Sequence, residues 1–236
     1  MNYYILKNNS DVNGVLAPGL DGSSVKGYED FFDNEKCTIT TFYDKEYKFD
    51  YLTPVTWGEF EVEPEIIIDF HKWIKEQPMR GLFYPISEKF KELLEEYNLP
   101  QHKFYEAKVL FQNKYHPYYV WHLIFQNYLE YIDFQNTRYN NLNSFRKLKQ
   151  DKLEIKQFSS YNEMRAYSRS NWSRSWNYEK IVMKSSFRDI DYCYVSGLNG
   201  GNLVSERLKI AIEEAGLTGV EFEDCPVPIE LSDEVG

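Results

Sequence analysis

The sequence predicts an α+β fold, in which a mixed or antiparallel sheet contains two related strand–helix–strand halves packed by amphipathic helices. Three observations predict it. Short runs of β-branched and aromatic residues recur along the chain, two segments carry helix-capping residues with apolar side chains at helical spacing, and these two segments resemble each other. With 236 residues, 42% of them hydrophobic and 17% aromatic, the chain can bury a substantial core.

The first helix is predicted at residues 87–97, with the sequence SEKFKELLEEY. Ser87 is a favourable N-cap, and Glu88 stands in the first turn, where the helix dipole favours an anion. Phe90 and Leu94 belong to one apolar face. The sequence NLP follows, and it ends the helix because Pro cannot continue it and Asn tolerates the left-handed backbone of a C-cap.

The second helix is predicted at residues 205–215, where the pattern returns after 118 residues as SERLKIAIEEA. Seven positions match in order: Ser205, Glu206, Lys209, Glu213, Glu214, Leu217 and Phe222 match Ser87, Glu88, Lys91, Glu95, Glu96, Leu99 and Phe104. Apolar stretches flank the first copy at residues 81–86 and 103–111. They flank the second copy at residues 190–195 and 220–222, so each half is expected to contain a strand–helix–strand unit.

The remaining elements are predicted from composition. Strands are expected at residues 2–7, 38–43, 104–113, 118–125, 128–133, 153–158 and 180–187, a short helix at 161–169, and a loop at 8–34. We expect residues 1–80 to be an N-terminal extension of strands and loops packed on a main domain of residues 81–236.

Charge is unevenly distributed along a chain whose net charge is −10. Residues 134–188 hold twelve Lys and Arg against four Asp and Glu, a balance of +8, whereas residues 1–133 and 189–236 each carry −9. This basic segment either packs against the acidic segments, which would neutralise it, or presents a contiguous positive surface.

The sequence favours a cytoplasmic protein. It shows no signal peptide and no apolar stretch long enough to span a membrane. The three cysteines, Cys37, Cys193 and Cys225, are far apart and form no zinc or disulfide pattern. The four histidines form no HExxH motif, and His122 is interpreted as a core residue. No metal and no cofactor is predicted.

No catalytic motif is recognisable, so we predict that the protein is not an enzyme. The chain contains no GxSxG, P-loop or GxGxxG sequence. The glycine-rich segment 197–201 is interpreted as a connector, and Asp189 and Asp191 as solvated charges at a strand edge.

The segment RAYSRSNWSRSW, residues 165–176, is the candidate binding site. Arg169, Trp172, Arg174 and Trp176 are candidate partner-binding residues, because Trp and Arg are the usual anchors of protein interfaces. Two alternatives stay open. The Trp rings can fill the core while the Arg side chains are solvated, or the segment can stack single-stranded nucleic acid.

Three motifs resemble a family of bacterial immunity proteins of polymorphic toxin systems, long catalogued as a domain of unknown function. They are LFYPISEKFKELLEE (residues 82–96), YYVWHLIF with YLEYIDF (118–134) and VSERLKIAIEEAGLTGVEF (204–222). The resemblance covers residues 82–223 and is most specific in the last thirty. Its motifs describe a helix cap and an amphipathic face, and it provides no catalytic residues.

The resemblance implies a cytoplasmic antidote that neutralises a cognate toxin domain by direct stoichiometric binding. An acidic protein suits a basic toxin, although the basic segment 134–188 favours an acidic partner surface. The alternative is a nucleic-acid-binding module that uses residues 134–188, and a third possibility is an enzyme whose site is assembled from scattered residues. No membrane partner is expected, and no motif specifies the toxin or the oligomeric state.

Overall fold

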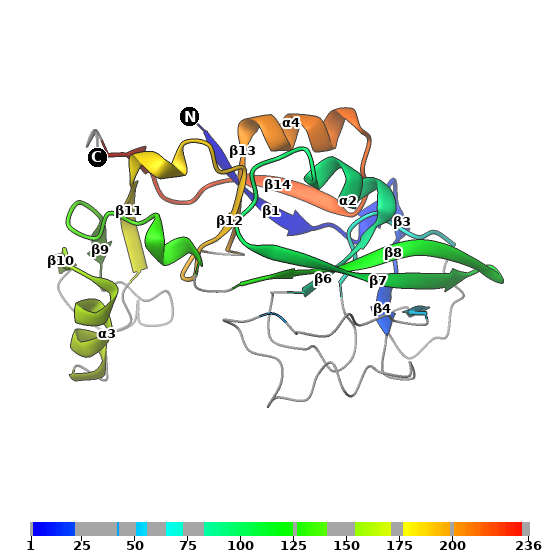
Figure 1. Cartoon of the computed structure of the whole chain (residues 1–236), viewed down its shortest axis with the longest axis horizontal. Coiled ribbons are helices and arrows are strands. Elements are labelled where there is room, and N and C mark those ends of the chain that lie inside the picture. Colours follow the sequence, from blue (N-terminus) through cyan, green and yellow to red (C-terminus); the bar gives the residue numbers. More distant parts are fainter. Residues whose placement is uncertain are drawn as a thin grey trace.

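The structure is a computed structural model that describes residues 2–21, 42, 51–55, 65–72, 83–124, 127–140, 154–170, 177–198 and 201–232. Within these residues the fold is α+β, with mostly antiparallel strands in several sheets, which confirms the predicted class. Figure 1 shows an elongated molecule with a long strand pair at one end and the helix α3 (Tyr161–Ser170) at the other.

The first half is built around the helix α2 (Glu88–Leu94). The strand β6 (Phe83–Ser87) leads into it, and the strands β7 (His102–Phe111) and β8 (Lys114–Leu123) follow it as a hairpin. β8 pairs antiparallel with both β6 and β7, and Phe70 adds an antiparallel bridge to Ile86 on the outer side of β6. The order across this half is therefore Phe70, β6, β8, β7.

The second half is built around the helix α4 (Glu206–Glu214). The strands β12 (Tyr192–Tyr194) and β13 (Asn202–Ser205) precede the helix, and β14 (Val220–Asp224) follows it. The fourth strand is β1 (Tyr3–Asn8), which pairs antiparallel with β13 and β14. The sheet order is β12, β13, β1, β14.

The two halves share one strand order and one register. In the first half Tyr119 of β8 lies opposite Ile86, and in the second half Tyr4 of β1 lies opposite Val204, which is 118 residues after Ile86. β1 therefore occupies the position that β8 occupies in the first half. The predicted pair of related halves is confirmed, and it includes a strand from the expected N-terminal extension.

The two helices begin as predicted. Ser87 Oγ accepts a hydrogen bond from the backbone N–H of Phe90 at 3.1 Å, and Ser205 Oγ accepts one from Leu208 at 3.2 Å. Each Ser is thus an N-cap that satisfies one N–H group of the first turn.

The Lys at equivalent positions of the two helices has the same environment in both halves. Each lies over two aromatic rings of its sheet and pairs with the Glu four residues later. The contacts are Lys91 to Phe104, Tyr119 and Glu95, and Lys209 to Phe222, Tyr4 and Glu213. The duplication therefore extends to side-chain packing.

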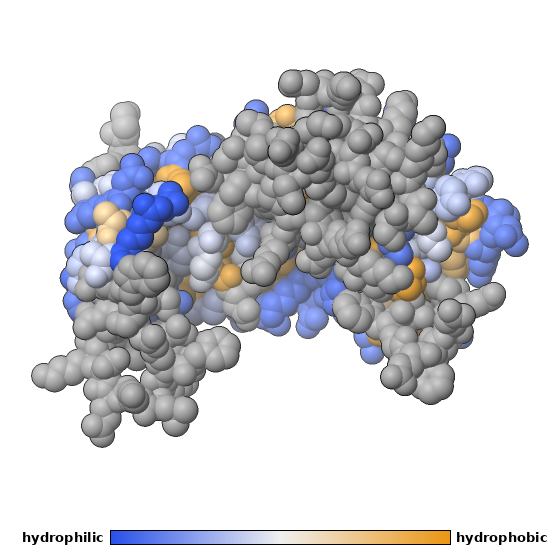
Figure 2. Space-filling model, turned by 90° about the horizontal axis from the view of Figure 1, so that it is seen from below, coloured by the Kyte–Doolittle hydropathy of each residue, from blue (hydrophilic) through white to orange (hydrophobic). Residues whose placement is uncertain are grey.

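Among the described residues, two hydrophobic clusters form a large part of the core. The first lies between the two helices and the two sheets, and it includes Phe90, Trp121 and Leu208. The second packs the other side of β1 and β13 against residues 127–198, and it includes Tyr139 and Phe187. Figure 2 shows that hydrophilic side chains predominate on the coloured part of the face seen there.

The remaining strands have two or three residues, except for β11, which has seven. They are β2 (Asp11–Val12), β3 (Val15–Leu16), β4 (Gly19–Asp21), β5 (Thr53–Val55), β9 (Arg138–Asn140), β10 (Ile155–Lys156), β11 (Asn177–Met183) and β15 (Ile229–Leu231). β9 pairs antiparallel with β10 and β11, whereas β15 pairs parallel with β11, so the sheet of order β10, β9, β11, β15 is mixed.

Four local predictions differ from the structure. The loop predicted at residues 8–34 contains the paired strands β2, β3 and β4 in its described part. Residues 128–133 do not form a strand, because the 3₁₀ helix η1 (Asn127–Glu130) leads into a turn there and only Ile132 makes a bridge, to Met183. Residues 180–187 end in a second 3₁₀ helix, η3 (Ser185–Phe187). The strand that enters α4 is β13 and not residues 190–195. The strand predicted at residues 38–43 lies outside the described residues, except for Phe42.

The segment 197–201 joins β12 to β13, which pair antiparallel. Gly197 and Gly201 have φ values of +93° and +72°, which favour glycine. The glycines therefore have a structural role between two paired strands, consistent with the interpretation of this segment as a connector.

Candidate interaction surface

Of the four candidate partner-binding residues, Arg169 is described, and it is an exposed residue near the end of α3. Trp172, Arg174 and Trp176 lie outside the described residues. The predicted short helix at 161–169 is confirmed, and the candidate surface is therefore built on α3 and its surroundings.

Local side-chain contacts fix the start of α3. Ser160 Oγ accepts the backbone N–H of Glu163 at 3.2 Å, and the Glu163 carboxylate accepts the backbone N–H and the hydroxyl of Ser159, both at 2.6 Å. These hydrogen bonds from Ser159 lower the pKa of Glu163. The sequence SSYNE thus forms a variant of the capping box.

One side of α3 packs on the protein and the other faces solvent. Met164 and Tyr167 contact the second core cluster, and the Lys156 ammonium lies 3.8 Å from the centre of the Tyr167 ring. Arg165 and Arg169 are exposed, and within the described part of the chain neither makes an ion pair or a side-chain hydrogen bond. No residue of α3 is buried. The helix therefore presents two guanidinium groups that have no partner among the described residues.

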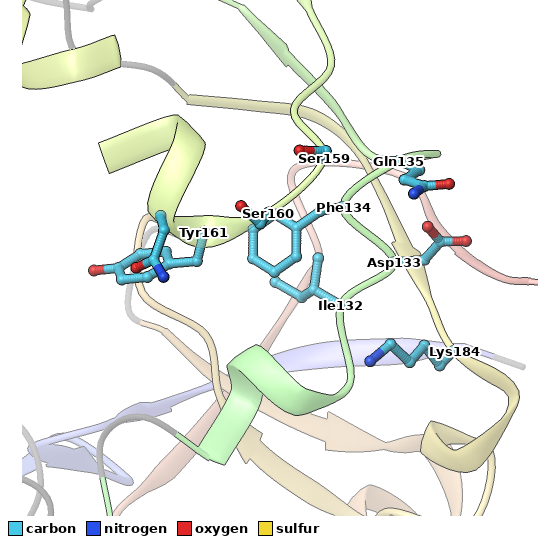
Figure 3. Close-up of a pocket in the computed structure, with 9 residues that line it drawn as sticks. Ile132, Asp133, Phe134, Gln135, Ser159, Ser160, Tyr161 and Lys184 are labelled. Atoms are coloured by element: carbon cyan, nitrogen blue, oxygen red, sulfur yellow. The ribbon is translucent and has the colours of Figure 1, made fainter. Parts of the chain in front are cut away.

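An open depression of about 500 Å³ lies beside the start of α3. Residues 132–135, residues 159–162 and Lys184 line it. Figure 3 shows Phe134 and Tyr161 within this lining, and their ring centres are 6.5 Å apart. Lys184 lies at the opposite side and donates a hydrogen bond of 2.8 Å from Nζ to the backbone oxygen of Glu130. The depression is thus partly aromatic, with a cation at its margin.

The basic segment is only partly neutralised where the structure describes it. Seven of its twelve Lys and Arg are described, and three of these pair with carboxylates: Arg138 with Glu179, Lys156 with Glu154, and Lys180 with Glu230. Of these carboxylates, only Glu230 belongs to an acidic flank. A contiguous positive surface over residues 134–188 stays a prediction.

Asp191 is not the solvated charge that the sequence suggested, so that interpretation was wrong for this residue. Its side chain is fully buried and accepts hydrogen bonds from Ser205 Oγ at 2.6 Å and from the backbone N–H of Asn98 at 2.9 Å. It also forms an ion pair with Arg207. Burial is tolerated because every contact stabilises the carboxylate. Asp189 is exposed, as expected.

Asp69 has the matching role in the first half. Its carboxylate accepts Ser87 Oγ at 2.6 Å, and it accepts the backbone N–H and hydroxyl of Thr218 at 2.8 and 2.9 Å. Each Asp thus binds the N-cap Ser of its own half and the segment that follows the helix of the other half. Such reciprocal contacts are typical of parts related by approximate two-fold symmetry, and here they join the halves.

The buried histidines belong to the core. His122 is fully buried, as predicted, and stacks on Phe83 with ring centres 4.1 Å apart. Burial lowers its pKa to about 4, and it also lowers the pKa of His71 to about 4. Within the described ranges, no three His, Cys, Asp or Glu side chains are arranged to hold a metal ion, and no helix is long and apolar enough to cross a membrane.

The outer end of the β7–β8 hairpin is a surface that sequence reasoning missed. Tyr115 is 60% exposed there, and Tyr51 lies beside it with ring centres 5.8 Å apart. The alternating polar and apolar residues of the hairpin predict strands. They do not predict an exposed surface, because the sequence does not show where α2 stops covering the sheet.

Comparison with known proteins adds no family. The sequence matches no protein-family model and no curated protein.

Proposed function

We propose that this protein is an immunity protein that binds a cognate bacterial toxin domain stoichiometrically and thereby blocks it. The resemblance of residues 82–223 to such proteins supports the proposal. The structural observation that carries it is the surface of α3, where Arg165 and Arg169 are exposed and unpaired among the described residues, next to an open aromatic depression.

This surface has the chemistry of a protein contact. Arg and aromatic side chains supply most of the binding energy at interfaces, and a shallow depression can accept one side chain of the partner. The capped start of α3 and its packing through Tyr167 hold the helix in place before binding, which reduces the entropy lost on association.

Charge acts at two ranges in this proposal. The net charge of −10 attracts a basic toxin domain over long distances, while the guanidinium groups of α3 contact acidic groups at the interface itself. Both effects weaken as salt screens the charges.

Co-expression with the C-terminal domain encoded by the adjacent gene tests the function. We expect growth to be restored and the two proteins to co-elute at a one-to-one ratio. Protection by amounts far below one equivalent would contradict a binding mechanism and favour an enzyme.

Substitutions then test the predicted site. Arg169→Glu, Trp172→Ala and Trp176→Ala are expected to weaken toxin binding at an unchanged melting temperature, by about 2 kcal/mol or more for an anchor residue. If the Trp rings belong to the core instead, these two variants lose about 3–5 kcal/mol of folding stability.

Nucleic-acid binding is the second candidate, because the same unpaired arginines are able to contact phosphates. Filter binding with single-stranded RNA and DNA at rising salt tests it. Affinity that falls steeply with salt, and that Arg165→Glu and Arg169→Glu abolish, would favour this candidate.

A further inference from the structure

Among the equivalent strands of the two halves, those of the β7–β8 hairpin differ most in length. β7 and β8 have ten residues each, whereas their counterparts β14 and β1 have five and six. The additional residues form the outer end of the hairpin, which Figure 1 shows projecting at the end of the molecule away from α3. Since β14 ends at Asp224 without such an extension, packing of the repeated unit does not require one on this strand.

The outer end carries contact residues on one face. Lys108 and Leu110 of β7 lie on this face. On β8, Pro117 lies directly opposite Lys108, and Tyr115 lies directly opposite Leu110. Nearer the body, α2 covers the same face through Lys91, which lies over Tyr119. At the outer end, Tyr115 is 60% exposed and Lys108 and Pro117 are also exposed.

Tyr51 extends this face. It is 36% exposed and contacts the Tyr115 ring, while the Lys108 ammonium lies 5.9 Å from the centre of the same ring. Figure 2 shows hydrophobic and hydrophilic side chains next to each other at this end of the molecule. Tyr residues are enriched at protein interfaces, because the ring packs while the hydroxyl group stays hydrated.

The backbone of the outer end is fixed in the free protein. The ladder continues to the pair Phe111–Lys114, and Gln112 and Asn113 close it with φ values of 49° and 58°, as in a type I′ turn. The backbone of Leu52 also hydrogen-bonds to β7, donating to Lys108 at 2.6 Å and accepting from Leu110 at 3.0 Å. A rigid projection loses little entropy when it binds.

The geometry points to the outer hairpin end, with Tyr51, Lys108 and Tyr115 on one face and Lys114 on the other face beside the turn, as a second contact surface that enters an acidic concave site on the toxin domain. This inference rests on the proposed function and names the part of the toxin that is bound. A convex projection fits a concave partner. Its two Lys residues on a protein of net charge −10 select a site of negative charge. Enzyme active sites are commonly concave and contain a few placed polar or charged groups, so insertion there would block the toxin directly.

Binding of the full-length protein to the toxin domain from the adjacent gene tests the inference by calorimetry. The variants are Tyr115→Ser and the double variant Lys108→Glu with Lys114→Glu. The matched control is Ile210→Ser, which alters an apolar residue that is 45% exposed on α4. Tyr115→Ser is expected to weaken binding roughly 30-fold, equivalent to about 2 kcal/mol. The double variant is expected to weaken binding most at low salt, and Ile210→Ser by less than about twofold.

The outcomes separate this inference from the proposed function. If the wild-type protein binds the toxin and both hairpin variants bind equally well, the hairpin surface is overturned while the function stands. If the wild-type protein does not bind, both are overturned. If the hairpin variants lose affinity for a single-stranded oligonucleotide but not for the toxin, the surface binds nucleic acid and the inference is wrong.

Discussion

Tyr84 donates a hydrogen bond of 2.8 Å to Asn202, the residue that stands at the equivalent position of the other half, 118 residues later. Tyr192 donates a second hydrogen bond to the same Asn202 oxygen, also at 2.8 Å. The Asn202 amide in turn donates to the backbone oxygen of Leu6 in β1. Asn202 is buried, so the two halves meet through a polar contact between equivalent strands.

Replacing Asn202 tests the importance of this contact. Asn202→Ala removes the acceptor that two buried hydroxyl groups share, and it is expected to cost about 2–4 kcal/mol of unfolding free energy. Tyr84→Phe removes one donor and leaves Tyr192 paired, so it is expected to cost about 1 kcal/mol. Urea unfolding followed by circular dichroism measures both, and equal losses would contradict the shared-acceptor role.

The reciprocal carboxylates predict unequal effects in the two halves. Asp191→Ala removes the acceptor of Ser205, Asn98 and Arg207 and is expected to cost about 3 kcal/mol. Asp69 makes no comparable ion pair among the described contacts, so Asp69→Ala is expected to cost less, about 2 kcal/mol of unfolding free energy. The exposed Asp189→Ala is the control, with a change within about 0.5 kcal/mol. Thermal or urea unfolding of the three variants gives the order.

Acid is expected to destabilise the protein through its buried histidines. The folded pKa of His71 and of His122 is about 4, below the usual value near 6.5, so the unfolded chain takes up the protons first as the pH falls. The stabilisation is therefore complete above pH 6.5 and is lost between pH 6.5 and 4. It amounts to as much as about 3 kcal/mol for each histidine.

The variant His122→Gln isolates this effect, because carboxylates titrate in the same way in both proteins. Between pH 7 and 5 its unfolding free energy should fall less steeply than that of the wild type. Parallel curves for the two proteins would show that His122 does not contribute.

Two glycines after α4 differ in what surrounds them. Gly216 has φ +62°, and a Cβ added there meets no atom within 4 Å, so Gly216→Ala is expected to cost only the backbone penalty of about 1–2 kcal/mol. A Cβ on Gly219, at φ +84°, would lie 2.5 Å from the backbone oxygen of Phe70. Gly219→Ala is therefore expected to cost several kcal/mol in urea unfolding, and a loss no greater than that of Gly216→Ala would exclude this close approach.

The starts of the predicted helices were correct because their signals are local, whereas α2 ends at Leu94, before residue 97, and Asn98 does not adopt the left-handed backbone expected of its C-cap. A Ser cap, an acidic first turn and apolar residues at helical spacing act within one segment, so α2 and α4 begin where Ser87 and Ser205 indicate. The capped start of α3 has the same origin. The repeat was also readable, since two copies of one local pattern stand 118 residues apart.

The strand predicted at residues 128–133 was wrong, because its sequence signal is not specific to strands. Aromatic and β-branched residues are compatible with any buried extended or turn conformation, and only the contacts available at residues 127–133 select a 3₁₀ helix and a turn there. Arg169 could be identified as exposed only once α3 was seen to bury no residue.

The sequence by itself determined the capped helices, the α+β class and the similarity of the two halves, since capping and periodicity depend on neighbours within a few residues. Only the tertiary structure decided that β1 completes the second sheet, that Asp191 is buried, and that the outer end of β7–β8 extends beyond α2. Each of these depends on contacts between segments far apart in the chain. Such contacts form only when the whole chain folds, because pairing of distant strands and burial of a charge are favourable only together with the rest of the core.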